Sequence, residues 1–129
     1  MNVCVYYEKI NEDSIRINRV YSLSPKIEIP ESIDGYVIRE IGNYCFSSKK
    51  VDLSKAILSC DIPSNYHECS GVDVESVKFP STLKKLGNYA FYNCRKLKEI
   101  YLPFSLMSIG SDVFMNCLLY TSDAADDRI

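Results

Sequence analysis

Apolar and polar residues alternate over short stretches near the start of this chain, a pattern typical of half-buried β-strands. Val3, Val5 and Tyr7 occupy alternate positions, and the alternation resumes over residues 15–17 after the polar run 11–14. This pattern predicts a β-hairpin within residues 1–24, followed by the loop-forming Ser22-Leu23-Ser24-Pro25.

A longer apolar pattern occurs twice without a gap, in residues 79–94 and again in residues 102–117. Pro, Gly, Phe and Cys recur at a constant offset of 23 residues, as Pro80 and Pro103 do. A period of this length suits one turn of a solenoid, in which a short strand and a return segment are joined by two corners.

The positions within one turn have separate structural roles. Alternation predicts that Ile100 and Leu102 point into the core and that Glu99 and Tyr101 point outward. Pro103 is expected to end the strand, because proline has no N–H to donate to a neighbouring strand.

The repeated aromatic position is expected to fill the centre of the solenoid. Phe91 and Phe114 are predicted to stack on one another. Cys45, Ala90 and Val113 share the position before each Phe, which requires a small or medium apolar side chain. We therefore interpret Cys45 as a core residue without chemistry.

Earlier copies of the pattern are modified. Residues 27–30 and 41–46 match its two halves, with five residues inserted around the hairpin signal Asp34-Gly35. Since Phe46 and Phe91 are almost two periods apart, a degenerate copy is expected between them. Its strand would be 51–53, with Tyr66 in place of the Phe and Cys69 in place of the repeated Cys.

These motifs carry a resemblance to a known family. The elements Leu86-Gly87, Ala90-Phe91 and Asn93-Cys94, followed by Leu97-x-x-Ile100-x-Leu102-Pro103, resemble the BspA-type leucine-rich repeat of bacteria over residues 25–117. The resemblance implies an α/β leucine-rich-repeat solenoid of short strands, turns and short helical segments. We expect the N-terminal hairpin to cap it, because an uncovered solenoid end exposes both core and strand edge.

The repeat pattern stops after Cys117. The run from Cys117 to Asp127 resembles the translation of a transposase sequencing adapter, although a genuine polar tail is also compatible with the loss of periodicity. Our interpretation is a non-native or disordered tail at 118–129 on a C-terminally truncated fragment.

Charge and hydropathy exclude several classes of function. The formal net charge is −2 with both signs interspersed, which gives no basic face for nucleic acid. The longest apolar run, residues 3–7, is too short to span a membrane. The start of the chain lacks the pattern of a signal peptide, so if Met1 is the true start we expect a cytoplasmic protein with reduced thiols.

One segment contains residue types that bind metals. Cys60, His67 and Cys69 lie within ten residues of one another, but no fourth ligand and no Cys-x-x-Cys pair accompanies them. A small zinc-stabilised domain is therefore an alternative, whereas the simpler interpretation makes Cys69 a core residue and His67 a surface residue. No catalytic constellation is evident, and we predict neither enzymatic activity nor a cofactor.

The favoured function is a non-enzymatic protein-protein interaction scaffold that presents a concave leucine-rich-repeat surface to a protein or peptide. A second alternative, implied by the resemblance, is a fragment of a cell-surface adhesin that binds host or matrix proteins. The predicted partner-binding residues are the outward side chains of successive strands: Lys26, Glu28, Lys50, Asp52, Ser76, Lys78, Glu99 and Tyr101.

Overall fold

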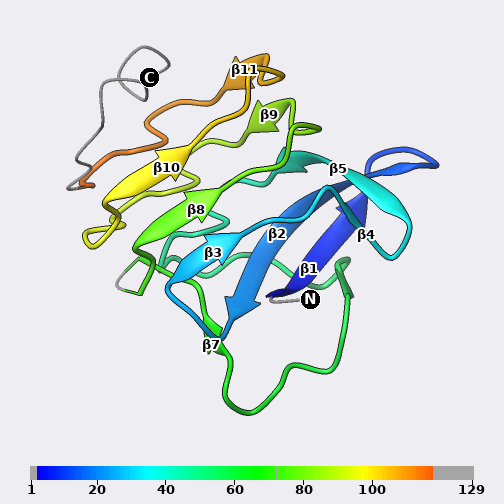
Figure 1. The fold of residues 1–129 in the computed structure, drawn as a ribbon, viewed down its shortest axis with the longest axis horizontal. Coiled ribbons are helices and arrows are strands. Elements are labelled where there is room, and N and C mark those ends of the chain that lie inside the picture. The colour runs from blue at the N-terminus through cyan, green and yellow to red at the C-terminus, as the bar shows by residue number, and fades with distance from the viewer. Residues whose placement is uncertain (1–2, 72, 118–129) are drawn as a thin grey trace.

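The computed structural model describes residues 3–71 and 73–117, which form two β-sheets facing one another (Figure 1). An eight-stranded sheet has the strand order β11-β9-β5-β2-β1-β6, with β4 paired to β5 and β7 paired to β2. A three-stranded parallel sheet has the order β10-β8-β3. The strands are β1 (Val3–Lys9), β2 (Ser14–Ser22), β3 (Lys26–Glu28), β4 (Ser32–Ile33), β5 (Tyr36–Ile41), β6 (Ile57–Leu58), β7 (His67–Glu68), β8 (Ser76–Lys78), β9 (Lys85–Leu86), β10 (Glu99–Tyr101) and β11 (Ser108–Ile109).

Three solenoid turns account for most of this architecture. Each turn contributes one strand to each sheet: β3 and β5, then β8 and β9, then β10 and β11. Parallel pairing sets Val77 opposite Ile100 and Leu86 opposite Ile109, so the 23-residue offset is the register between the second and third turns. The residues between these strands fill the space between the sheets.

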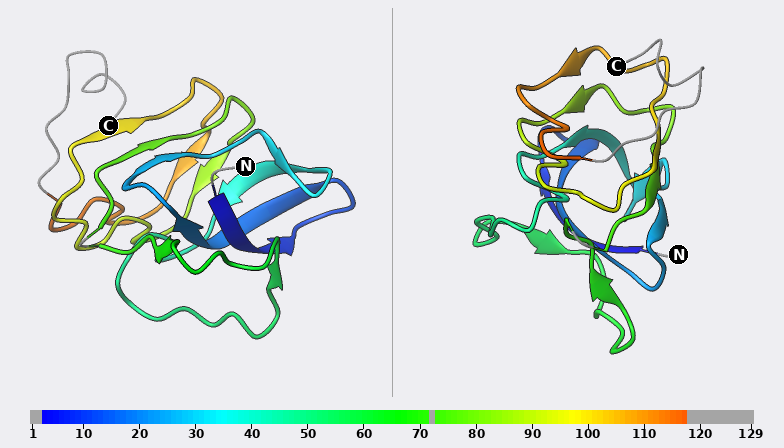
Figure 2. Two further views of the ribbon diagram at one scale, coloured as in Figure 1. Left: turned by 60° about the horizontal axis from the view of Figure 1, so that its bottom comes forward. Right: turned by 90° about the vertical axis from the view of Figure 1, so that its left-hand side faces the viewer.

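The first and second turns are direct neighbours, so the degenerate turn expected between them was wrong. β3 pairs with β8 and β5 pairs with β9. Residues 48–71 instead run away from the stack, where β6 pairs with β1 and β7 pairs with β2 (Figure 2). Cys69 is buried as expected, but its N–H donates to the carbonyl of Val20 in β2, outside the repeat stack.

Each stacked turn has a glycine at its corner, four residues before the Phe, and the segment 48–71 lacks it at the matching position before Tyr66. A Cβ at Gly87 would lie 2.6 Å from the carbonyl carbon of Gly42 and from the nitrogen of Asn43, both backbone atoms. The stacked turns therefore need glycine at this corner, where the expected degenerate turn would have Ile62. This close approach lets the N–H of Gly87 donate to the carbonyl of Ile41 at 2.8 Å.

An asparagine side chain strengthens the same corner. The Oδ1 of Asn43 accepts a hydrogen bond from the backbone N–H of Asn88, and the Oδ1 of Asn88 accepts one from the N–H of Ser111, both at 2.8 Å. These bonds satisfy backbone donors that would otherwise be left without a partner at the bend.

The return strands are β5, with six residues, and β9 and β11, with two each, and turns follow them. The described residues contain no helix, contrary to the expected short helical segments. One reason is the backbone conformation after each corner, where Tyr44, Tyr89 and Asp112 have φ of 60°, 56° and 51°. Such left-handed residues interrupt a right-handed helix. A second reason is that the N–H of Phe46 donates to Ala90 of the next turn, instead of to a carbonyl of its own turn.

A column of phenylalanine rings forms the centre of the core, as predicted for Phe91 and Phe114. Their rings stack with centroids 5.6 Å apart, and Phe46 stacks on the other face of Phe91 at 4.8 Å. Phe79 meets both Phe46 and Phe91 edge-on. Ala90, Cys45 and Val113 lie beside this column and are buried.

The N-terminal hairpin occupies the position of a preceding turn. β1 and β2 pair antiparallel, and β2 continues the large sheet beside β5 with Ile17 opposite Ile41. The carbonyl of Ile17 accepts the N–H of Gly42 at 2.7 Å, just as Ile41 accepts that of Gly87. The strand β2 therefore provides the first turn with the hydrogen-bond partner that a preceding turn would provide.

A buried arginine completes this end of the stack. Arg19 in β2 is 2% exposed, and its guanidinium donates to the carbonyls of Ser47 and Lys49. At the position equivalent to Ser47 in the third turn, the carbonyl of Met115 accepts the backbone N–H of Asn93. The guanidinium thus replaces the N–H groups of an absent turn, and Glu68 lies 3.7 Å from its Nε.

The Phe column should dominate the stability of the array. We expect Phe91→Ala to lower the free energy of unfolding by about 3–5 kcal/mol, because it removes the ring with stacked neighbours on both faces. Urea denaturation followed by circular dichroism measures the change. The exposed Tyr101→Ala serves as the control and should cost less than about 0.5 kcal/mol.

Arg19 should contribute more to the free energy of unfolding than Arg16, which lies on the same strand. Arg19→Met keeps most of the side-chain volume but leaves the carbonyls of Ser47 and Lys49 without this donor, so we expect a loss of about 2–3 kcal/mol. Arg16→Met, which removes partly exposed ion pairs with Glu8 and Glu40, should cost about 0–1 kcal/mol. Equal losses in the two variants, measured by urea denaturation, would contradict the capping role.

Candidate binding surface

The three-stranded sheet presents six side chains on its outer face. The middle residue of each strand, Ile27, Val77 or Ile100, is at most 3% exposed and points into the core. The flanking residues point the other way because side chains alternate along a strand. They are Lys26, Glu28, Ser76, Lys78, Glu99 and Tyr101, and all except the partly buried Ser76 are exposed.

Parallel register arranges these side chains in two rows across the strands. Lys26, Ser76 and Glu99 form one row of opposed residues. Glu28, Lys78 and Tyr101 form the other row. Neighbouring strands lie about 4.8 Å apart, so the three side chains of each row extend over roughly 10 Å.

The third turn provides the aromatic group of this face. Tyr101 is 52% exposed, and its hydroxyl donates to Oε2 of Glu99 on the same strand. This hydrogen bond to the carboxylate, together with the negative charge, raises the pKa of Tyr101 above its ordinary value. The phenol therefore stays neutral and can serve as a hydrogen-bonding and stacking group at physiological pH.

The remaining two predicted binding residues, Lys50 and Asp52, lie elsewhere. Residues 51–53 form no strand and have no place in the three-stranded sheet, because the expected turn between β3 and β8 does not exist. Both residues instead line a separate polar hollow of 580 Å³ that also includes Arg16 and Lys85. The prediction that they share a face with Lys78 was wrong.

A second hollow, which was not predicted from the sequence, adjoins the outer face of the three-stranded sheet. It measures 700 Å³ and lies where the three strands end. Its lining includes the proline that follows each strand, two exposed aromatic residues, two charged side chains of the outer face and one charged residue of the loop after β3: Pro30, Pro80, Pro103, Tyr101, Phe104, Glu28, Lys78 and Glu31. The recurrence of Pro after each strand is the sequence signal that could have located it.

The cysteines near His67 do not form a metal-binding group. Cys60 is joined to Cys4 of β1 by a disulfide with Cα atoms 5.8 Å apart, so the expectation of reduced thiols is wrong for this pair. The thiol of Cys69 donates to the carbonyl oxygen of His67, and burial raises the pKa of Cys69 to about 12. Within residues 3–71 and 73–117, no group of three His, Cys, Asp or Glu side chains could hold a metal ion.

The other cysteines belong to the repeat core. Cys45 is fully buried, and burial raises its pKa. Cys94 donates its thiol hydrogen to the carbonyl of Phe46, and Cys117 does the same to Phe91, so each thiol bonds to the preceding turn. These contacts give the repeated Cys a structural role.

The part of the chain that the structure describes has no helix long and apolar enough to cross a membrane. The predicted tail at 118–129 lies outside the described residues.

Comparison with known proteins identifies the repeat. The family described as "BspA type Leucine rich repeat region (6 copies)" matches residues 60–127, more than half of the chain. A comparison with curated proteins gave no significant match.

Solved structures show the same fold. A leucine-rich repeat protein from T. pallidum matches 93% of this chain at 22% identity with a TM-score of 0.56. A leucine-rich cell surface protein from Faecalibacterium prausnitzii matches 89% at 20% identity and 0.61, and a leucine-rich repeat protein from Bacteroides capillosus matches 91% at 14% and 0.56. This chain spans 63%, 28% and 94% of the lengths of these proteins, respectively.

The match of the family to residues 60–127 agrees with the observed geometry, in which stacked turns share a Gly corner, a Phe column and a strand that ends at Pro. The chain belongs to the BspA-type leucine-rich repeat family.

Proposed function

We propose that this chain is a non-enzymatic scaffold that binds a protein or peptide through the outer face of β3, β8 and β10. The observation that carries the proposal is the register of the three strands, which sets outward side chains from residues far apart in sequence into two continuous rows. Repeat arrays commonly use such extended surfaces for binding.

The chemistry of the face favours a polypeptide partner. Lys78 lies between Glu28 and Tyr101 in its row, so both signs of charge and an aromatic ring lie side by side. A small apolar ligand would require a mostly apolar, enclosed pocket, whereas this surface is open and mixed in charge. Tyrosine combines a large contact area with a hydrogen-bonding tip, which suits protein interfaces.

The hollow beside the proline corners gives this face a place for an anchoring side chain. Its lining includes the apolar rings of Pro80 and Pro103 and the carboxylates of Glu28 and Glu31. We infer that an extended peptide crosses the rows and inserts one apolar side chain here, with a basic residue next to it. Apolar anchors with polar surroundings are the usual source of affinity at such sites.

Two substitutions test the surface. Lys78→Ala and Tyr101→Ala should each raise the Kd for a partner about tenfold or more, which corresponds to about 1.4 kcal/mol, because both residues are exposed and lie side by side in one row of the face. Isothermal titration calorimetry with a partner purified on the unaltered chain measures the change, and circular dichroism checks folding. Lys50→Ala is the matched control, because Lys50 is exposed but outside the face. A partner that loses affinity only with the control variant would refute the proposed surface.

A second candidate, a fragment of a cell-surface adhesin, has one specific observation in its favour. The disulfide between Cys4 and Cys60 joins residues 56 positions apart. Such bonds persist outside the reducing cytoplasm. The structurally similar Faecalibacterium protein is described as a cell surface protein. In this role the same outer face would contact a host or matrix protein.

The oxidation state of Cys4 and Cys60 distinguishes an exported protein from a cytoplasmic one. In protein recovered from its native source, denatured and alkylated without reductant, we expect four modified cysteines, namely Cys45, Cys69, Cys94 and Cys117. With reductant all six should be modified. Mass spectrometry counts the added groups, and Cys4→Ser should raise the unreduced count by one through Cys60. Six modified cysteines without reductant would exclude the exported form.

A further inference from the structure

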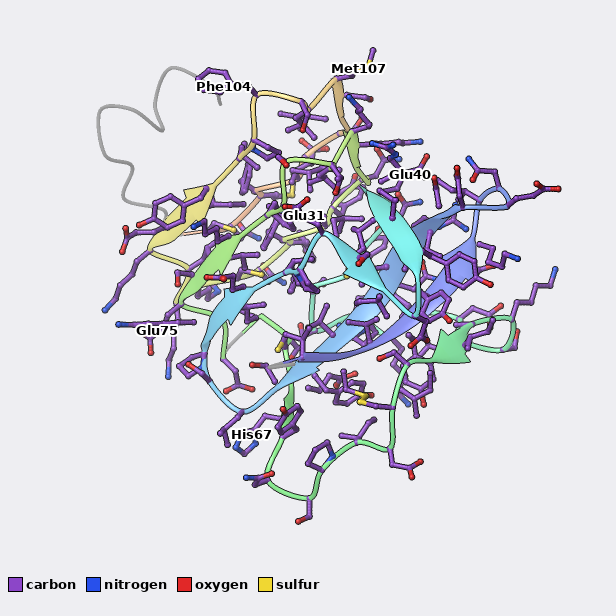
Figure 3. All side chains as sticks on the ribbon, turned by 45° about the vertical axis from the view of Figure 1, so that its right-hand side comes forward. Glu31, Glu40, His67, Glu75, Phe104 and Met107 are labelled. Carbon is purple, nitrogen blue, oxygen red and sulfur yellow. A yellow bond between two sulfur atoms is a disulfide. The ribbon has the colours of Figure 1, made fainter. Side chains whose placement is uncertain are left out.

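Two thiols lie one repeat apart against the core of the second and third turns. Cys94 and Cys117 occupy the same position of their turns, 23 residues apart. The asparagine before each of them marks the register, because Nδ2 of Asn116 donates to Oδ1 of Asn93 at 2.9 Å. These turns form the part of the stack away from the hairpin, where Figure 3 labels Met107 of the third turn. The proposed binding face involves neither thiol.

The backbone holds the two sulfur atoms near one another. The N–H of Asn93 donates to the carbonyl of Met115 at 2.9 Å, as between paired parallel strands. Backbones bonded in this way lie about 4.8 Å apart, which is within the range of about 4.4–6.8 Å that separates the Cα atoms of a disulfide. The thiol of Cys94 lies within hydrogen-bonding reach of the sulfur of Cys117. The two residues can therefore be joined without a rearrangement of the turns.

The two thiols differ in reactivity. Cys117 is partly exposed, whereas Cys94 is fully buried. When Cys117 ionises, the thiol hydrogen of Cys94 can turn from the carbonyl of Phe46 to its sulfur, and this hydrogen bond lowers the pKa of Cys117 below its ordinary value. The same hydrogen bond, together with burial, raises the pKa of Cys94. Because the thiolate is the nucleophilic form of cysteine, Cys117 reacts first and Cys94 lies beside it as a protonated, resolving thiol.

We propose that Cys94 and Cys117 form a disulfide between the second and third turns when the protein meets hydrogen peroxide. The thiolate of Cys117 attacks one oxygen of the peroxide, the O–O bond breaks, and hydroxide leaves, so that Cys117 becomes a sulfenic acid. The sulfur of Cys94 then attacks the sulfenic sulfur, the S–O bond breaks, and the thiol proton of Cys94 leaves with the hydroxyl group as water. The two thiols lose two electrons in total, and the peroxide gains them.

The other two free thiols are poorly suited to this reaction. Cys45 and Cys69 are buried, and burial raises the pKa of both, that of Cys69 to about 12. Both therefore stay protonated at neutral pH. Cys69 also donates to the carbonyl of His67, outside the repeat stack. Cys45 lies near Cys94, which makes it the rival partner that an experiment has to exclude.

The new bond would strengthen the stack at its third turn. The disulfide between Cys94 and Cys117 closes a loop of 23 residues that contains β10 and β11. A cross-link of this kind restricts the unfolded chain more than the folded one, so it favours the folded array. The oxidised chain should consequently unfold at a higher urea concentration than the reduced chain.

Mass spectrometry of the full 129-residue chain tests the proposal. Without peroxide, denaturation and alkylation in the absence of reductant should modify the four free cysteines. After treatment of the folded chain with a small excess of hydrogen peroxide, the number modified should fall from four to two. Trypsin cuts after Arg95, between Cys94 and Cys117, so the bond should appear as two linked peptides that reductant separates. Urea denaturation of the treated chain measures the expected stabilisation.

Two variants identify the roles of the thiols. Cys94→Ser should leave Cys117 as a sulfenic acid that dimedone traps, because the resolving thiol is gone. Cys45→Ala is the matched control, since the second turn has Ala90 at this position, and it should still give the same linked peptides. The absence of a link between Cys94 and Cys117 after oxidation, a link that contains Cys45 or Cys69 instead, or disulfides that join two chains would each overturn the proposal.

Discussion

The close approach of successive corners is the constraint on which the rest of this structure depends. At Gly87 and Gly110 the backbones of adjacent turns come so near that no side chain fits between them, and at Gly42 a Cβ would lie 2.6 Å from Oδ1 of Asn18 and 3.2 Å from the carbonyl oxygen of Ile17. This spacing allows N–H and carbonyl groups of one turn to bond with the next, and it brings the phenylalanine rings into stacking contact. The segment 48–71, which has Ile62 at the matching position, lies outside the stack.

The same constraint explains how the two ends differ. A regular turn forms backbone hydrogen bonds with the turn before it and the turn after it. The first turn therefore requires a substitute partner on the side where no repeat precedes it. The strand β2 supplies backbone groups in register with β5, and the guanidinium of Arg19 supplies donors to two corner carbonyls. Burying this cation is compatible with stability because those carbonyls and the nearby carboxylate of Glu68 compensate for its lost hydration. The third turn has no equivalent arrangement within the described residues.

The irregular segment, residues 48–71, connects the first turn to the second along the chain without adding a turn of its own. Its short strands lie beside β1 and β2, and the disulfide of Cys60 with Cys4 fixes it at one further point. The binding face consequently contains three strands with no interruption between β3 and β8. Residues such as Lys50 that belong to the segment are therefore separated from the face on which Lys78 and Tyr101 lie.

The sequence by itself determined the turn length, the Phe column and which residues of β3, β8 and β10 point outward. These features arise from interactions that repeat with a fixed period or alternate along one strand, and such patterns can be read locally. Only the tertiary structure decided the path of residues 48–71, the pairing of Cys4 with Cys60 and the capping role of Arg19. Each of these depends on contacts between residues about 20 to 60 positions apart, and no repeated motif in the sequence indicates such contacts. The chain forms them because the backbone groups of the first turn need hydrogen-bond partners that the local pattern does not contain.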